Sequence, residues 1–255
     1  MTFKQSKSCL IFAHRGGNRE AKDVAENTRA AFNYALSHAV DGIETDVQLS
    51  LDEVPVLWHD GFLDKLGHPG KCIDDFDFAQ LEQMDFAGYC SPEAESEGAL
   101  SFKEFIDTYQ GRCGLDIELK SRDGESQQRL ESKIRKMLAI IGPSAADGVF
   151  ISSFNLPALV LIHQYAPDLP LYYLLTGRHT QADIEQFLKD YSFLAGFCLP
   201  IDIHNASIAE LLRERGRSVG VYTCNSEKDI QKALDLKVDI LITDYPQLAL
   251  RMRDA

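Results

Sequence analysis

The sequence predicts an α/β protein built as a distorted (β/α)8 barrel (a TIM barrel), with a hairpin after the second strand and a small insertion. Three observations predict this fold. Short β-rich runs alternate with amphipathic helical patterns along most of the chain, which is typical of parallel strands joined by helical crossovers. Two neighbouring runs are too close for such a crossover. Eight runs remain when the returning run of that hairpin is discounted, and eight is the strand number of this barrel.

The expected strands are short runs that interrupt the helical periodicity. In chain order they cover residues 9–13, 42–49, 54–58, 114–119, 148–152, 170–174, 194–199, 218–222 and 239–243. The second and third runs are separated by only a few residues, whereas a parallel crossover needs a dozen or more. They must therefore form a hairpin with its turn near Ser50–Glu53, which places residues near 46 opposite residues near 58.

Helical patterns fill the intervals between these strands. Apolar residues at i, i+3, i+4 and i+7 indicate one buried face in each of two segments: Phe32, Ala35, Leu36 and Ala39, then Leu130, Ile134, Met137, Leu138 and Ile141. Ser101-x-x-Glu104 and Ser226-x-x-Asp229 resemble capping boxes and predict helix starts.

Residues 61–100 lack this alternation and are rich in Gly, Asp and Glu. We interpret them as an inserted cap at one end of the barrel, so that residues 1–255 form a single domain.

The composition excludes several classes of protein. The 255 residues are 45% hydrophobic and 25% charged, as in ordinary globular proteins. Lys and Arg number 26 and Asp and Glu 39, so the net charge is 26 − 39 = −13, which disfavours nucleic acid and stable association with anionic membranes. The sequence has no run of 18 apolar residues and no signal-like N-terminus, which predicts a cytoplasmic location. Its six scattered cysteines form no CxxC pair and are interpreted as reduced, structural residues. The sequence does not indicate an oligomeric state.

Polar residues concentrate where the expected strands end, which is where (β/α)8 barrels carry their functional groups. In chain order these ends read His14-Arg15-Gly16-Gly17, Glu44-x-Asp46, His59-Asp60, Glu118-x-Lys120, Ser152-Ser153-Phe154, Tyr222-Thr223-Cys224-Asn225 and Thr243-Asp244-Tyr245-Pro246.

Three acids in this set can form a metal site. Glu44 and Asp46 are two apart in a strand, so their side chains share a face, and Glu118 comes from the next barrel strand. If that face is the barrel interior, the carboxylates need a cation or must take up protons. An all-oxygen set favours Mg²⁺ or Ca²⁺ over zinc. The alternative is that the acids face solvent, and the pattern alone does not decide between the two faces.

Two histidines and two basic residues complete the candidate site. His14 and His59 are suited to divide general acid and base work. Arg15 and Lys120 either bind phosphate oxygens or neutralise the acids. Gly16 and Gly17 allow backbone to approach a ligand closely.

The residues around the start of the first helix have more modest expected roles. Thr28 is expected to be an N-cap. Glu26 and Asn27 are candidates to orient the site residues.

The ordered series of motifs resembles the glycerophosphodiester phosphodiesterase family. The resemblance runs from about residue 10 to 246 and rests on His14-Arg15-Gly16, Glu26-Asn27-Thr28, Glu44-x-Asp46-Val47-Gln48, Pro55-Val56, His59-Asp60, Glu118-Leu119-Lys120, Ser153-Phe154, Tyr222-Thr223-x-Asn225 and Thr243-Asp244-x-Pro246. Tyr222 stands where the family usually has Trp, and it keeps an aromatic wall while adding a hydroxyl.

The resemblance implies hydrolysis of small-molecule glycerophosphodiesters to glycerol 3-phosphate and an alcohol. It implies one divalent cation, Mg²⁺ or Ca²⁺, held by Glu44, Asp46 and Glu118. It assigns acid and base catalysis to His14 and His59 and phosphate contacts to Arg15 and Lys120. Phe154 and Tyr222 are expected to line the substrate.

Two alternatives and several details stay open from the sequence. One alternative is a lysophospholipase D or phospholipase C-like activity on lipids, and the other is a non-catalytic barrel that binds phosphorylated ligands. The preferred head group, the choice of Mg²⁺ or Ca²⁺ and the division of roles between the two histidines are not decided. The nucleophile is either water or the glycerol 2-hydroxyl, which would form a cyclic phosphate.

Overall fold

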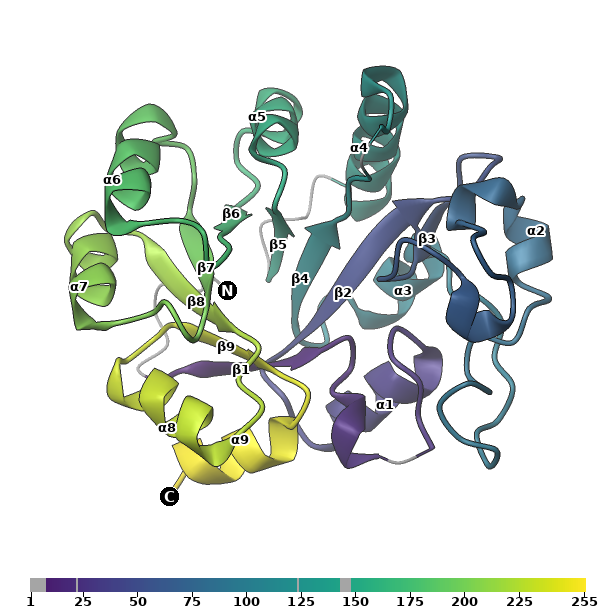
Figure 1. The fold of residues 1–255 in the computed structure, drawn as a ribbon, viewed down its shortest axis with the longest axis horizontal. Coiled ribbons are helices and arrows are strands. Elements are labelled where there is room, and N and C mark those ends of the chain that lie inside the picture. The colour runs from purple at the N-terminus through teal and green to yellow at the C-terminus, as the bar shows by residue number, and fades with distance from the viewer. Residues whose placement is uncertain (1–7, 22, 123, 143–147) are drawn as a thin grey trace.

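The computed structural model describes residues 8–21, 23–122, 124–142 and 148–255, and confirms the predicted barrel (Figure 1). Each strand pairs in parallel with its neighbours in the order β1-β9-β8-β7-β6-β5-β4-β2, and β1 also pairs with β2, which closes the barrel. Its strands are β1 (Leu10–His14), β2 (Gly42–Leu49), β4 (Gly114–Leu119), β5 (Val149–Ser153), β6 (Leu171–Leu174), β7 (Gly196–Pro200), β8 (Ser218–Tyr222) and β9 (Ile240–Thr243). These bounds lie within two residues of the predicted ones.

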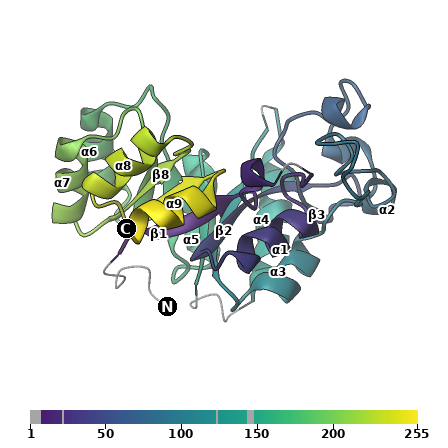
Figure 2. The same cartoon turned by 90° about the horizontal axis from the view of Figure 1, so that it is seen from below.

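Helices surround the barrel on its outside (Figures 1 and 2). They are α1 (Arg29–Ser37), α3 (Phe102–Tyr109), α4 (Gln127–Ile141), α5 (Leu156–Tyr165), α6 (Gln181–Asp190), α7 (Ala206–Glu214), α8 (Glu227–Asp235) and α9 (Pro246–Arg253), with a short 3₁₀ turn η2 (Asn18–Glu20) before α1. Among the described residues, no helix is both long and apolar enough to cross a membrane.

The helix starts follow from side-chain caps. Thr28, Ser101 and Ser226 each accept a hydrogen bond from the backbone N–H three residues later. These bonds satisfy donors that the first turn of a helix leaves unpaired. One helix end differs from the prediction. Ala39 was expected on the buried face of the first helix, but α1 ends at Ser37 and Ala39 adopts a positive φ of 53°.

The predicted hairpin is confirmed, including its register. β3 (Pro55–Leu57) runs antiparallel to β2, with Val47 opposite Leu57. Beyond β3, the Trp58 N–H donates to the Asp46 carbonyl at 3.1 Å. The hairpin therefore returns the chain to the level of Asp46, and His59 follows at once.

The barrel interior has an apolar layer below and a polar layer above it, where 'above' means toward the C-terminal ends of the strands. The lower layer contains Phe12, Phe150, Tyr172, Leu174, Cys198, Ile240 and Ile242. Gly42 makes room for it, since a Cβ there would lie 2.3 Å from the Phe12 ring. Ile43 and Val47 belong instead to the core between strands and helices. Alternation along β2 therefore turns Glu44 and Asp46 inward, above the apolar layer.

Residues 61–100 form short turns beside the hairpin: η3 (Asp64–Leu66), η4 (Ile73–Asp75) and the single-turn α2 (Phe78–Leu81) (Figure 1). Leu63, Ile73, Leu81, Phe86 and Ala99 from this segment pack with Val56 and Trp58 of the hairpin in a small core of their own. The description of the chain as one domain with this segment as a cap stays a prediction.

Candidate active site

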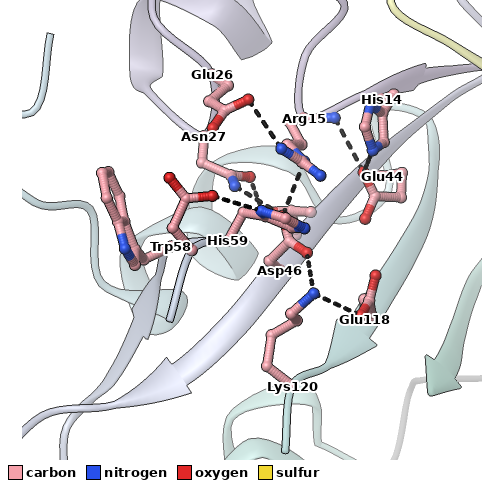
Figure 3. Close-up of polar contacts among 12 residues, drawn as sticks. His14, Arg15, Glu26, Asn27, Glu44, Asp46, Trp58, His59, Glu118 and Lys120 are labelled. Carbon is pink, nitrogen blue, oxygen red and sulfur yellow. Dashed lines mark hydrogen bonds and ion pairs between the residues drawn. The ribbon is translucent and has the colours of Figure 1, made fainter. Parts of the chain in front are cut away.

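The three predicted acids meet inside the barrel at the C-terminal ends of their strands. Asp46 pairs with Glu118 in the parallel register of β2 and β4. One carboxylate oxygen from each of Glu44, Asp46 and Glu118 lies within 4.8 Å of the other two (Figure 3). The interpretation in which these acids face the barrel interior is therefore confirmed, and the alternative in which they face solvent is wrong.

The pKa values of the three carboxyl groups are shifted in different directions by burial and by the neighbouring charges. Burial raises the pKa of Glu44 well above its ordinary value, and the neighbouring Asp46 raises it further. Burial likewise raises the pKa of Glu118. Burial also disfavours the ionised form of Asp46, but Lys120 and Arg15 outweigh it and lower the pKa of Asp46 to about 2. The site therefore favours the ionised form of Asp46 and disfavours that of Glu44.

The two predicted basic residues flank the acids. Lys120 Nζ lies 2.8 Å from Glu118 Oε1 and 3.4 Å from Asp46 Oδ1. Arg15 Nε lies 3.3 Å from Asp46 Oδ2, and its terminal nitrogen lies 3.0 Å from Glu26 Oε2. Both cations offset the charge of the acids, one of the two roles expected for them. Their contact with phosphate stays a prediction.

The residues present fit a hard divalent cation. Asp46 Oδ1 is buried and makes no hydrogen bond within the described part of the chain, although the Lys120 ammonium lies 3.4 Å away. Such an oxygen is costly to bury unless a cation or proton meets it. All three side chains offer oxygen ligands, the set that Mg²⁺ and Ca²⁺ prefer.

Each predicted catalytic histidine is held at Nδ1 by an aspartate. His14 Nδ1 lies 2.6 Å from Asp244 Oδ1, and His14 Nε2 lies 3.9 Å from Glu44 Oε2. His59 Nδ1 lies 2.7 Å from Asp60 Oδ1. These contacts orient both rings through Nδ1, so Nε2 is the ring nitrogen that each aspartate leaves open to other partners.

Gln48 holds the backbone that carries His59. Its side-chain amide donates at 2.8 Å to the carbonyls of Trp58 and Asp60, on either side of His59. Gln48 is two residues beyond Asp46 on β2, so one strand positions both a predicted metal ligand and a predicted catalytic residue.

The loop after β1 closes on the acids from above. Arg15 has a φ of 51°, and its backbone N–H donates to Glu44 Oε2 at 3.0 Å. Asn27 donates its amide to Asp46 Oδ2 at 2.9 Å, which agrees with its expected orienting role.

Gly16 and Gly17 make close packing contacts within the protein that the sequence did not predict. A Cβ on Gly16 would lie 2.5 Å from the Ala31 Cβ, and one on Gly17 would lie 2.6 Å from Pro246. Both also have positive φ. The close approaches are therefore to the protein itself and allow α1 and α9 to pack against the loop.

A cavity of about 150 Å³ opens above the acids and has an aromatic edge. Phe154 and Tyr222 pack edge to face with ring centroids 6.0 Å apart. The Tyr222 hydroxyl donates to the Leu175 carbonyl, while Phe154 is 41% exposed. The cavity is lined by His14, Arg15, Glu44, His59, Asp116, Glu118, Ser152, Phe154, Leu174, Tyr222, Thr223 and Ile242.

Sequence reasoning missed the acids behind this site. Asp60 and Asp244 stand in the strand-end motifs, but their pairing with the histidines was not foreseen. Asp116 lies in the cavity wall and accepts a hydrogen bond from the Ser152 hydroxyl at 2.6 Å. The signal for Asp116 was available, because it precedes Glu118 by two residues on β4, the same spacing as Glu44 and Asp46.

Comparisons with known proteins agree with this geometry. Residues 14–248 match the model of the glycerophosphoryl diester phosphodiesterase family. The chain is 29% identical to a glycerophosphodiester phosphodiesterase of Bacillus subtilis, over 94% of this chain and 84% of the relative. It is 28% identical to one of Bacillus altitudinis, over 96% and 98% of the two chains.

A solved structure supports the same relationship. The chain superposes with a TM-score of 0.85 and 26% identity on an Oleispira antarctica phosphodiesterase, described in complex with the product sn-glycerol-3-phosphate. The alignment covers 99% of each chain. These findings remove the alternative of a barrel that only binds its ligand. The protein therefore belongs to the glycerophosphoryl diester phosphodiesterase family and is a phosphoric diester hydrolase.

Proposed function

We propose that this enzyme hydrolyses glycerophosphodiesters to glycerol 3-phosphate and an alcohol, in a reaction that depends on one Mg²⁺ or Ca²⁺. Family membership supports the reaction class. The buried carboxylates of Glu44, Asp46 and Glu118 support the cation, because they concentrate oxygen ligands in one place. A cation bound there would supply positive charge to the phosphate oxygens and to the charge that develops in the transition state.

One observation carries the catalytic assignment. Two histidines, each held at Nδ1 by an aspartate, line the same cavity beside the acid cluster. A phosphodiester needs a base to deprotonate its nucleophile and an acid to protonate its leaving alkoxide. His14 and His59 can exchange protons at Nε2 while their aspartates hold each ring in place at Nδ1.

Arg15 and Lys120 have the positions needed for the charge of the substrate. Both border the acid cluster, and both are partly buried where water screens little. We propose that they contact the phosphate when it enters, in exchange for part of their present contact with the carboxylates. Together with the proposed divalent cation, these two residues would outweigh the three carboxylates, so that a chain with a net charge of −13 could accept an anion at this site.

The aromatic edge is proposed to face the organic part of the substrate. Phe154 is exposed at the cavity, and its ring is supported by the edge-to-face contact with Tyr222. Carbon–hydrogen groups of glycerol pack favourably on such rings, since apolar surface leaves water.

The test is a product analysis on a panel of substrates. The purified enzyme is stripped of divalent ions, given back Mg²⁺ or Ca²⁺, and assayed on glycerophosphocholine, glycerophosphoethanolamine and lysophosphatidylcholine. We expect glycerol 3-phosphate and the free alcohol from the first two, only with a cation, and no turnover in the matched Glu44→Gln variant. A cyclic phosphate seen by phosphorus NMR during turnover would identify the glycerol 2-hydroxyl as nucleophile.

Other products would contradict the proposal in distinct ways. Release of phosphocholine would indicate cleavage on the other side of phosphorus, as in a phospholipase C. Choline release from lysophosphatidylcholine with little activity on glycerophosphocholine would indicate a lysophospholipase D. Full activity after exhaustive chelation would show that the reaction needs no cation at the three carboxylates.

A further inference from the structure

Lys65 connects the inserted segment to both sides of the active site. It lies in η3, and its Nζ atom is 2.6 Å from Glu26 Oε1 and 3.0 Å from Asp60 Oδ2. Glu26 uses its other oxygen to bind Arg15 (Figure 3), and Asp60 uses its other oxygen to bind His59. One ammonium group therefore bridges the two carboxylates that hold a predicted phosphate ligand and a predicted acid–base catalyst.

The surroundings of Lys65 restrict where this ammonium can go. Its Nζ lies 4.3 Å from the ring centroid of Trp58 and 4.7 Å from that of Tyr89. Trp58 is buried and packs edge to face on Phe86 at 5.1 Å, so the small core of the segment holds this wall. Cation–π contacts of this kind favour the charged form and a fixed position.

The charge of Lys65 is maintained in this setting. Burial by itself would lower the pKa of the ammonium, but Glu26, Tyr89 and Asp60 together outweigh burial and leave the pKa above its ordinary value. The side chain is 25% exposed, so its ion pairs are shielded from bulk water more than surface pairs are. Removing it would leave Glu26 and Asp60 free to turn away from their partners.

We propose that Lys65 is a positioning residue for catalysis, and that it makes the inserted segment a working part of the active site. It would act through Asp60 on the orientation of His59 and through Glu26 on that of Arg15. This inference rests on the proposed roles of His59 and Arg15. Residues that orient ligating or catalytic side chains typically contribute 10–100-fold to activity.

The test compares Lys65→Met with a matched lysine elsewhere. Lys103 forms an exposed ion pair with Asp107 on α3, away from the site, and Lys103→Met is the control. With Mg²⁺ or Ca²⁺ and glycerophosphocholine, we expect Lys65→Met to lower kcat about 10–100-fold. We expect Lys65→Arg, which keeps the positive charge over the two rings, to lose less activity than Lys65→Met, and Lys103→Met to stay within about threefold of wild type.

A double-mutant cycle separates positioning from a loss of structure. Asp60→Asn alone should lower kcat, and Lys65→Met added to it should lower kcat by a smaller factor than it does in the wild type, because the path through Asp60 to His59 is then already lost and only the path through Glu26 to Arg15 remains. Independent, multiplying losses would overturn the proposal. So would a kcat of Lys65→Met within twofold of wild type.

The proposal for Lys65 can also be tested if Lys65→Met does not fold, and it can be told apart from a failure of the proposed function. If Lys65→Met does not fold, Lys65→Gln, which also removes the charge, decides, and a kcat within twofold of wild type at an unchanged unfolding temperature would contradict the proposal. An inactive wild-type enzyme would instead overturn the proposed function itself, so the two failures are distinguishable.

Discussion

His14 Nδ1 lies 2.6 Å from Asp244 Oδ1, although the two residues are 230 positions apart in the chain. The contact joins the end of the first strand to the end of the last, across the closure of the barrel. Asn225 donates to the other oxygen of Asp244 at 2.6 Å, so the carboxylate is held from both sides.

This pair makes a first prediction. Asp244→Asn should lower kcat at least about tenfold, because the His14 ring would lose the carboxylate that orients it and selects the nitrogen carrying its proton. Steady-state kinetics on glycerophosphocholine measure the effect, with Asp168→Asn as an exposed control. Wild-type kcat in Asp244→Asn would refute a role for this contact.

The histidines themselves should be indispensable. His14→Ala and His59→Ala are each expected to lower turnover by about 10²–10⁴-fold, the usual contribution of a general acid or base. Their unfolding temperatures should change little, since both rings lie at the cavity rather than in the core. The control is His38→Ala, at the outer end of α1. A variant that keeps more than about a tenth of the wild-type rate contradicts its assignment.

Divalent cations should stabilise the fold. A cation relieves the repulsion among Glu44, Asp46 and Glu118, and at 100 times its dissociation constant it contributes about 2.7 kcal/mol. For a chain of this length that corresponds to a rise of about 5–10 °C in unfolding temperature. Thermal unfolding with Mg²⁺, Ca²⁺ or a chelator at matched ionic strength measures it. An equal rise in Glu44→Gln would show that the cations bind elsewhere.

Phe154 should affect substrate binding more than chemistry. Loss of its ring removes an apolar contact of about 1–2 kcal/mol, so Phe154→Ala is expected to raise KM about 5–30-fold and to keep kcat within about threefold. Phe62, 53% exposed on the inserted segment, provides the matched control. The proposed contact would be excluded if both variants showed the same KM as wild type.

His204 predicts a pH dependence of stability. It is 1% exposed, and its ring nitrogens make no hydrogen bond to described residues. Burial, then the charges of Lys232 and Arg213, lower its pKa from 6.5 to about 4. Below pH 6.5 the unfolded chain binds a proton at His204, whereas the folded chain does not bind it until the pH approaches 4. The free energy of unfolding therefore falls as the pH drops from about 6.5 to 4.

The size of this effect can be isolated by substitution. Urea unfolding at pH 7.5 and pH 5 should show a smaller loss of unfolding free energy in His204→Leu than in wild type, by roughly 1–2 kcal/mol. An identical loss in the two proteins would mean that His204 is protonated equally in both states.

Much of the site was predictable because the relevant signals are local. The spacing of Glu44 and Asp46 places them on one face of a strand whatever the rest of the chain does. The short connection between 42–49 and 54–58 allows only a hairpin, and that hairpin brings His59 to the level of Asp46. Residues at strand ends converge once the strands are parallel.

The partners of those residues were less predictable, because they depend on contacts between distant segments. Nothing near Glu26 in the chain indicates that Lys65 binds it, since 39 positions separate them and the inserted segment has no periodicity. The packing contacts of the glycines were not predictable for the same reason. Gly16 is required by Ala31 on a packed helix, a neighbour visible only in the fold.

The sequence by itself determined the barrel, the hairpin register and the chemical groups of the site, because strand period, turn length and residue type are properties of short segments. Only the tertiary structure decided that Glu44 and Asp46 face inward, which aspartate holds each histidine, and that Lys65 bridges Glu26 and Asp60. The physical reason is closure. Pairing of β1 with both β2 and β9 sets which face of each strand is enclosed and which loops meet, and no local pattern encodes that choice.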